Sequence, residues 1–185
     1  MSPVAALGAM GAAGSPDLGS AGSQELRDGF RQAMRRVAAT VAIVTTRHDG
    51  QRFGATATSV TSASMSPPSV LVCLNRDGEL CRRVSMTGAF CVNMLAKDQA
   101  DLARIFSGAR SHDARFAEST GWEEGEDLPF LAGAQCSVFC DTAQSMDWGT
   151  HTVFIGAVRK VTILPHVDPL LYCDGGFRRL SQPTA

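Results

Sequence analysis

The sequence predicts a mainly β domain, a closed or nearly closed antiparallel barrel with a few helices packed on it. Short runs rich in β-branched and apolar residues alternate with turns built from Gly, Asp and Pro, as in an antiparallel sheet. These runs are not separated by regular helices, and no GxGxxG sequence follows a strand. A doubly wound parallel sheet with a nucleotide crevice is therefore excluded.

The 185 residues, 44% of them hydrophobic, suit one domain with a substantial core. Residues 1–23 are rich in Gly, Ala, Ser and Pro and are expected to form a flexible tail. The domain is assigned to residues 24–181, with a short tail at 182–185. A helix over residues 24–38, with Ser23 as its N-cap, is predicted from apolar residues at helical spacing, and we expect this face to pack against the core. These residues are Leu26, Phe30, Ala33, Met34 and Val37.

The remaining elements follow from local patterns. Strands are predicted over residues 40–46, 51–58, 70–75, 89–95, 134–141, 150–164 and 170–173. A turn at residues 48–50 joins the first two strands, and Gly156 is expected to bend or bulge the long strand. Short helices are predicted over residues 79–85 and from a cap at Asp98 to a stop at Gly108. Residues 109–128 are expected to be irregular, with Phe116 and Trp122 as anchors.

Charge and composition exclude several classes of partner. Lys and Arg number 17 against 18 Asp and Glu, so neither a nucleic acid nor an anionic membrane surface is expected as the main partner. No apolar run approaches the roughly 20 residues of a membrane span, and the first residues lack the basic start of a signal peptide.

The six cysteines are interpreted as reduced thiols. No CxxC pair occurs, and four of the six lie within apolar strand-like runs of a chain large enough to build its own core. Because Cys136 and Cys140 have no paired His/Cys motif nearby, we predict no zinc site, and no metal at all. The expected location is the cytoplasm.

Residues 54–75, GATATSVTSASMSPPSVLVCLN, form the stretch around which the chain is organised. Small and hydroxylated residues at its start leave a backbone that a flat, polar-edged ligand can approach closely. Apolar residues 70–74 predict a buried strand that would hold this surface rigid. Taken alone, the same stretch also fits a surface loop or a strand whose hydroxyls point into water.

Outside this stretch, His151 opens a long apolar strand where a site could form, and a local hydrogen bond at the strand start is an equal alternative. Arg76, at a strand end, could bind phosphate through its planar fork of donors or could simply lie on the surface. The acidic run at residues 123–127 is interpreted as a solvated loop rather than a metal site. No GxSxG sequence supports a hydrolase triad.

Five motifs in order resemble the flavin reductase component of two-component flavin-dependent monooxygenases: GATATSVTSASMSPPSVLVCLNR, FCVNML, DLARIFSG, WGTHTVFIGAV and DPLLYCDGGFRRL. The resemblance covers about residues 26–180. It implies an FMN-binding split β-barrel, antiparallel and of Greek-key type, and a homodimer with flavin sites near the subunit interface. The implied activity is NAD(P)H-dependent reduction of free FAD or FMN, which then supplies a partner monooxygenase or halogenase, as in secondary metabolism.

The resemblance also implies roles for individual residues. The isoalloxazine cradle corresponds to Thr56, Ala57 and Thr58, with Ser62, Ala63 and Ser64 beyond it. The ribityl and phosphate side corresponds to Cys73, Leu74, Asn75 and Arg76, and a helix end along the flavin to Phe106, Ser107 and Gly108. A Gly-x-His motif associated with the nicotinamide is matched by Gly149 and the candidate catalytic residue His151, and Tyr172 resembles another wall of that site.

The sequence departs from the family pattern in two places. Gly78 and Leu80 stand where many members carry Ser and Thr that serve the phosphate, so Arg76 or backbone groups are expected to compensate. The middle residue of the Gly-x-His motif, often Asp, is Thr150, and Asp147 lies just upstream.

The residues are compatible with hydride transfer from a nicotinamide to a flavin. That reaction needs two flat rings stacked with the reacting atoms roughly 3–3.5 Å apart, which a ledge of small residues allows. NADH is favoured over NADPH because no basic cluster for a 2′-phosphate stands out, while FMN and FAD both stay open. Two other functions stay open: a flavoprotein that keeps FMN and acts on its own substrate, and a non-enzymatic flavin-binding module.

Overall fold

One antiparallel seven-stranded sheet makes up most of the computed structural model, which describes residues 20–109, 115–116 and 121–181. Its strands run in the order β3-β2-β6-β9-β10-β5-β4. They are β2 (Ala42–His48), β3 (Gln51–Ala57), β4 (Val60–Met65), β5 (Pro68–Asn75), β6 (Ala89–Met94), β9 (Cys136–Trp148) and β10 (His151–Ile163). Only Thr58 and Ser59 join β3 to β4, although these strands form opposite edges, so the sheet must curl until its edges nearly meet. The predicted antiparallel barrel is confirmed.

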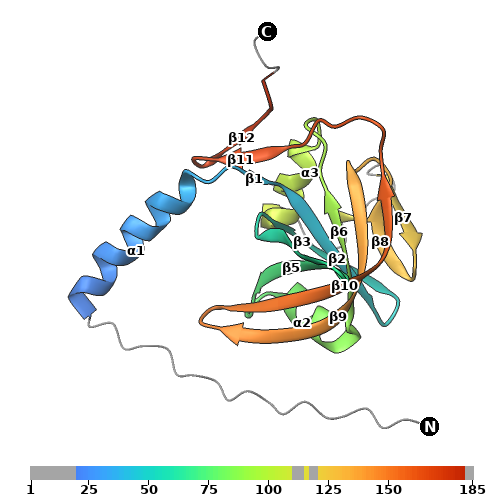
Figure 1. The fold of residues 1–185 in the computed structure, drawn as a ribbon, viewed down its shortest axis with the longest axis horizontal. Coiled ribbons are helices and arrows are strands. Elements are labelled where there is room, and N and C mark those ends of the chain that lie inside the picture. Colours follow the sequence, from blue (N-terminus) through green and yellow to red (C-terminus); the bar gives the residue numbers. More distant parts are fainter. Residues whose placement is uncertain (1–19, 110–114, 117–120, 182–185) are drawn as a thin grey trace.

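The smaller elements surround this barrel, as Figure 1 shows. The helical segments are α1 (Ser20–Arg35), α2 (Glu79–Thr87) and α3 (Ala100–Arg104), the last continued by a π-helical turn, η1 (Ile105–Ala109). The short strands are β1 (Ala39–Thr40), β7 (Trp122–Gly125), β8 (Leu128–Leu131), β11 (Leu171–Cys173) and β12 (Gly176–Arg178). The β2–β3 hairpin turns at Asp49 and Gly50, whose φ angles of 49° and 75° match the twist of a two-residue hairpin.

The barrel interior is filled by alternate side chains of the strands. Its main cluster includes Val44, Val72, Val92 and Phe154, all essentially inaccessible to solvent. A second cluster lies on the other side of β2, where Phe106, Phe116 and Trp122 pack with ring centroids 5.0–5.2 Å apart. The two predicted anchors, Phe116 and Trp122, are therefore confirmed as packing residues, which tie η1 and β7 to the barrel.

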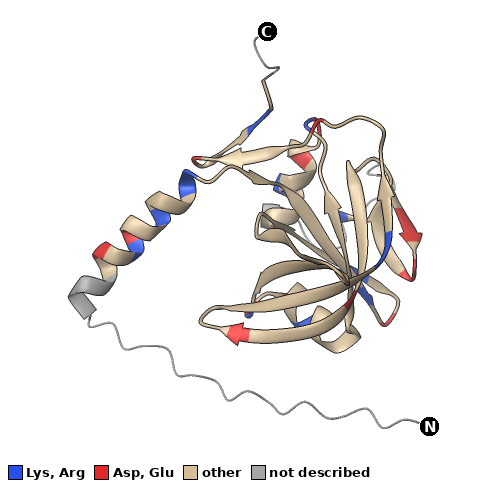
Figure 2. Ribbon diagram, in the orientation of Figure 1, with Lys and Arg blue, Asp and Glu red and all other residues tan. Residues whose placement is uncertain are grey.

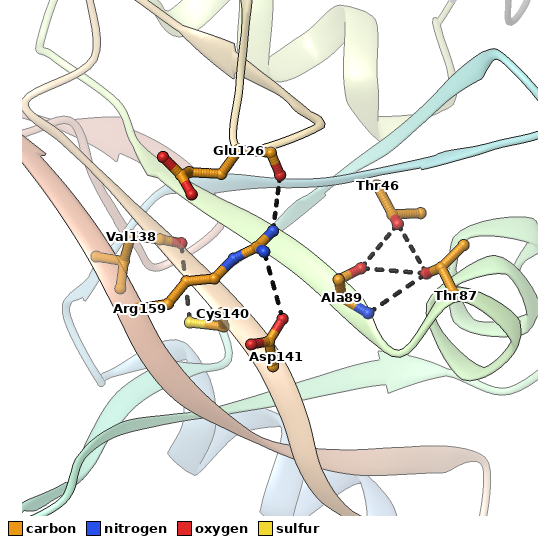
Figure 3. Close-up of polar contacts among 8 residues, drawn as sticks. All are labelled: Thr46, Thr87, Ala89, Glu126, Val138, Cys140, Asp141 and Arg159. Atoms are coloured by element: carbon orange, nitrogen blue, oxygen red, sulfur yellow. Dashed lines mark hydrogen bonds and ion pairs between the residues drawn. The ribbon is translucent and has the colours of Figure 1, made fainter.

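Polar contacts join elements that are far apart in the sequence (Figure 3). The Thr46 hydroxyl on β2 lies 2.8 Å from the carbonyl oxygen of Ala89 and 3.0 Å from the Thr87 hydroxyl, which links β2, β6 and the end of α2. The Arg159 guanidinium on β10 donates to the carbonyl of Glu126 at 2.7 Å and lies 3.6 Å from Asp141, so it holds the β7–β8 turn against the barrel.

The first helix differs most from the expectation. It begins at Ser20 rather than after Ser23, and instead of packing on the core it stands clear of the barrel (Figure 1). Its apolar side chains are solvent-exposed, with Leu26 at 57% and Phe30 at 63%. Only its base is anchored, where Arg35 pairs with Asp174 at 3.0 Å. Helical periodicity fixed which face is apolar but carried no information on which surface that face covers.

Other differences are smaller. The N-cap of α3 is Gln99 rather than Asp98, and the Gln99 side chain, which accepts from the Ala96 amide and donates to the Gly133 carbonyl, makes no bond to the helix amides. Strands β7 and β8 lie within or beside a segment expected to be irregular, and β4 was not predicted as a strand. The bulge expected near Gly156 is confirmed, because the register shifts between Ile155 and Gly156. The N-terminal tail was predicted over residues 1–23, but residues 20–23 belong to α1; residues 1–19 and the predicted tail at 182–185 lie outside the described residues.

Candidate functional site

A cavity of about 640 Å³ opens at the split of the barrel, where the two edge strands come together. Strand β3, the end of β5, the start of α2 and the turn η1 form its walls. Ten of the residues singled out from the sequence line it: Thr56, Ala57, Thr58, Cys73, Leu74, Asn75, Phe106, Ser107, Gly108 and His151. Segments separated by up to about a hundred residues therefore meet in one place, as the resemblance implied.

The β3 wall is poor in side-chain bulk. Gly54 belongs to this wall, and a Cβ added there would lie 2.8 Å from the Phe106 ring, so glycine allows the ring of η1 to pack against the strand. The Thr56 hydroxyl donates to the carbonyl of Ala103 at 2.7 Å and is thereby turned toward α3. What this wall offers to a ligand is mainly backbone and methyl groups, which suits a flat aromatic ring.

The opposite wall is built by a tight turn between β5 and α2. The Asn75 side-chain oxygen accepts from the Asp77 amide, and the Asn75 carbonyl accepts from the Gly78 amide, each at 3.0 Å. A Cβ on Gly78 would lie 3.0 Å from that carbonyl, which explains why glycine occupies the position. The first N–H groups of a helix lack partners within the helix, so α2 presents its positive end here. Glu79, at the start of α2, is paired with Arg83 at 3.2 Å.

His151 stands at the rim between this cavity and a second hollow of about 790 Å³. One ring nitrogen, Nδ1, lies 2.9 Å from the Thr150 hydroxyl, which leaves Nε2 available for a ligand. The second hollow lies between α1 and the sheet and is also lined by Tyr172 and Phe30. Thr58 and Ser59 border both hollows, as His151 does, so the two hollows are adjacent and share these three residues.

Some of the implied site residues lie elsewhere. Ser62, Ala63 and Ser64 are on β4, exposed or half-buried, and do not line the cavity. Arg76 and Gly149 lie just beyond it, where the Arg76 guanidinium donates to the Gly149 carbonyl at 3.2 Å. Sequence reasoning did not single out Gly54, Glu79, Cys81 or Arg115, which do line the cavity. Only the glycine next to the Thr/Ala run carried a local signal that could have found it.

Burial and ion pairs account for several other polar groups near the site. Burial raises the pKa of the Cys73 thiol, so at neutral pH this cavity residue is a neutral group. Glu124 of the acidic run pairs with Arg52 at 2.7 Å and Arg47 at 3.2 Å. Within the described residues, no cluster of three His, Cys, Asp or Glu side chains could hold a metal ion. No helix in the same part of the chain is both long and apolar enough to cross a membrane.

The split barrel, its cavity poor in side-chain bulk and the histidine at the rim together match the flavin reductase class that the sequence resemblance implied. The sequence profile of the flavin reductase like domain matches residues 34–181, and the chain belongs to this family. The reductase component of an FADH2-dependent resorcinol hydroxylase from Rhizobium sp. is 39% identical over 145 residues, 77% of this chain and 81% of the relative.

Two further relatives agree with that assignment. The FMN reductase (NADH) RutF of Pseudomonas syringae pv. syringae is 36% identical over 156 residues, which are 84% of this chain and 87% of RutF. Among solved structures, the NADH:FAD oxidoreductase SgcE6 of Streptomyces globisporus C-1027, in complex with NAD and FAD fragments, superposes with a TM-score of 0.78. It is 31% identical, and the match covers 85% of this chain and 94% of that one.

Proposed function

We propose that this protein is an NADH:flavin oxidoreductase that reduces free FAD or FMN and passes the reduced flavin to a partner enzyme. The observation that carries the proposal is that the cavity and the second hollow are adjacent and share His151, Thr58 and Ser59. A flavin ring held on the β3 wall would keep one face open toward the second hollow. Hydride transfer needs two rings stacked with about 3–3.5 Å between the reacting atoms, so such an opening is required.

The residues of this chain then act by binding and orienting. The backbone of β3 at residues 54–57 offers a surface for the flavin ring, and Phe106 packs against this strand at Gly54. The amide groups at the start of α2 offer donors to an anionic flavin tail. His151 Nε2 is placed to bond a polar group of the nicotinamide nucleotide at the rim. No side chain needs to act as a nucleophile, because the bound flavin and nicotinamide supply the redox chemistry.

Steady-state kinetics with each flavin and each nicotinamide test the activity directly. We expect NADH oxidation that depends on added FAD or FMN, and the same assay with NADPH compares the two nicotinamide donors. If neither NADH nor NADPH is oxidised when flavin is added, the proposal is overturned. If the protein binds flavin but shows no such oxidation, it is a flavin-binding module.

The exchange of flavin separates a reductase from a flavoprotein that keeps its cofactor. The cavity opens to solvent past Thr58 and Ser59, which are both exposed, so a bound flavin could leave readily. We therefore expect a flavin Kd of about 1 μM. Gel filtration should therefore strip the flavin from the protein. Flavin that stays bound through gel filtration and dialysis would instead indicate an enzyme that uses held FMN on a substrate of its own.

The partner enzyme is proposed to be a flavin-dependent monooxygenase or halogenase that receives the reduced flavin by diffusion. The name of the resorcinol hydroxylase reductase describes such a division of labour for that relative. The six cysteines are all free thiols, which favours a reducing compartment, and we propose the cytoplasm as the location.

A homodimer is the proposed assembly, and two surfaces favour it. The first is the outer face of β9, β10 and β5. Register places Val153 opposite Cys73 and Ile155 opposite Leu71, while the intervening Phe154 points into the core. Met146 and Trp148 extend this face to the hairpin tip and are 60% and 55% exposed. Three strands rarely present so many apolar side chains to water, so a protein surface is expected to cover them.

The second surface is the apolar face of α1. It borders the second hollow through Phe30 and Met34, with Val37 just beyond the helix, and that hollow also touches His151. A second copy of the chain could bury both surfaces at once in an isologous contact, because each subunit presents one arm and one sheet face. Such a dimer would place the site next to the subunit interface, and the mass in solution measures whether it forms.

A further inference from the structure

The turn that carries His151 is tied to the end of β5 by a single residue. The Arg76 amide donates to the carbonyl of Thr150 at 3.0 Å, and its guanidinium Nη1 donates to the carbonyl of Gly149 at 3.2 Å. Arg76 Nε lies 3.6 Å from an oxygen of Asp147. One arginine therefore contacts both residues of the β9–β10 turn and the strand that enters it.

Asp147 extends these contacts across the hairpin. Its second oxygen accepts from the hydroxyl of Thr152 at 2.6 Å, and the two residues face each other in the β9–β10 register. Thr152 is only 6% exposed, so this bond fixes the turn to a buried point of the barrel. The rest of the tip is exposed, which leaves these bonds and the backbone ladder as its main restraints.

The orientation of the imidazole depends on this turn. Thr150, whose carbonyl Arg76 holds, places its hydroxyl 2.9 Å from His151 Nδ1. The chain of contacts from Arg76 through Thr150 thus determines where Nε2 points at the rim. Arg76 itself lines neither the cavity nor the second hollow, and its donors are directed at the hairpin.

We propose that Arg76 is a positioning residue for His151 and not a ligand of the flavin phosphate. The proposal rests on the proposed reductase function, because it assigns to His151 the contact with the nicotinamide nucleotide. A phosphate ligand would have to turn its guanidinium away from Gly149 and Asp147 toward the start of α2.

Two variants and a matched control test this role. Arg76→Met keeps the length of the side chain and removes the donors, and Asp147→Asn removes the charge that Arg76 faces. Arg178→Met changes an arginine whose guanidinium, among the described residues, donates to the carbonyl of its neighbour Phe177. For Arg76→Met we expect the KM for NADH to rise about five- to tenfold, with kcat changed less, and Asp147→Asn should follow in the same direction. Arg178→Met should leave both constants at their wild-type values.

Binding measurements separate positioning from phosphate recognition. In fluorescence titrations, Arg76→Met should bind FMN and riboflavin as the wild type does, within about twofold. A loss of FMN affinity with unchanged riboflavin affinity would overturn the proposal, because only FMN carries the phosphate. In the His151→Ala background, Arg76→Met should add nothing to the KM for NADH, and multiplicative effects would contradict action through His151.

The NMR signal of the His151 imidazole gives a readout that does not depend on turnover. It is assigned as the signal lost in His151→Ala, and we expect it to shift or broaden in Arg76→Met and in Asp147→Asn but not in Arg178→Met. An unmoved signal would overturn the positioning role even if the wild type is an active reductase. A wild type that oxidises no NADH would refute the proposed function, while a shifted signal would still show that Arg76 orients the ring.

Discussion

Asn93 is a fully buried amide whose hydrogen-bonding groups join four strands. Its nitrogen donates to the carbonyl of Ile43 at 3.0 Å and to the Thr45 hydroxyl at 3.2 Å. Its oxygen accepts from the amide of Leu131 at 2.9 Å and from the Ser137 hydroxyl at 2.8 Å. Strands β2, β6, β8 and β9 therefore meet at one side chain that has no unpaired capacity.

Replacing this amide should destabilise the fold strongly. In Asn93→Ala the buried amide of Leu131 and the hydroxyls around it lose their partner, and we expect a loss of about 3 kcal/mol in the free energy of unfolding. Urea denaturation measures it, with Gln51→Ala on an exposed position of β3 as a control that should change by less than about 0.5 kcal/mol. Equal effects of the two substitutions would show that the network contributes little.

The role of His151 can be separated from flavin binding. Because its ring lies at the rim shared by the two hollows, His151→Ala should raise the KM for NADH about tenfold while the flavin Kd changes by less than about twofold. Steady-state kinetics and flavin fluorescence titration give the two constants. Similar changes in both would place His151 in the flavin site instead.

The buried thiols of Cys91 and Cys140 should make the protein less stable at alkaline pH. Burial, reinforced by the Asp141 carboxylate, raises the pKa of Cys140 to about 12, and burial also raises the pKa of Cys91. In the unfolded chain both thiols ionise near pH 8.5, so the unfolded state gives up protons that the folded state keeps. The contribution of the two buried thiols to the free energy of unfolding is therefore complete below about pH 8.5. It declines as the pH rises toward 12.

Denaturation at several pH values measures this effect. Between about pH 8.5 and 10 each thiol should lower the free energy of unfolding by up to ~1.4 kcal/mol per pH unit. The double variant Cys91→Ala, Cys140→Ala should show a correspondingly shallower decline, whatever its stability at neutral pH. Parallel curves for the variant and the wild type would mean that the thiols already ionise in the folded protein.

At the level of single residues, the sequence could predict part of the site, while the other residues reach the cavity only through the tertiary structure. Thr56 and Ala57 line the cavity because small residues beside a buried strand leave room for a ligand, and that pattern is visible in the sequence. Ser62 lies in a stretch of the same small, hydroxylated residues but is exposed on β4. A polar strand has no apolar alternation, so the sequence does not tell which of its side chains face the core. Glu79 and Arg115 reach the cavity through tertiary packing alone.

Among the elements, β10 depends on one position where no side chain fits. Gly156 lies at the register shift of β10 against β9, and a Cβ there would be 2.5 Å from the Phe90 ring and 2.8 Å from the Cys140 Cβ. Gly156→Ala should therefore lower the free energy of unfolding by about 2 kcal/mol. Gly29→Ala is the matched control, because nothing lies within 4 Å of that position on α1 and alanine favours helix. Thermal unfolding should rank control, wild type and Gly156→Ala in that order of decreasing Tm.

The elements that sequence patterns located are those with a strong period. Strand β10, with Thr152 and Phe154 buried on one face, shows the alternation of a half-buried strand. By contrast, β7 and β8 are four residues each, too short for any period, and are held by the packing of Trp122. The apolar face of α1 was predicted correctly, yet its position was not, because helical periodicity does not specify which surface that face covers.

Across the whole molecule, charge and apolar surface are distributed unevenly. Figure 2 shows basic residues along α1 and at the barrel end near α2, while the long β9–β10 hairpin carries few charges. The tip of this hairpin, at Thr150 and His151, and the arm α1 line the same hollow. Burying these surfaces between two copies would therefore exclude water from the side of the cavity where the nicotinamide is proposed to bind.

A charge placed on either surface should dissociate the proposed dimer. We expect sedimentation equilibrium to give the mass of two chains for the wild type. Val153→Asp, in the middle of the outer face, and Phe30→Asp on α1 should each weaken association at least about 100-fold, because a buried unpaired carboxylate is costly. Met86→Asp, on an exposed position of α2, is the control and should remain dimeric. A monomeric wild type, or variants that stay dimeric with either charge, would contradict this assembly. If the monomeric variants also lose affinity for NADH, the second copy completes the site.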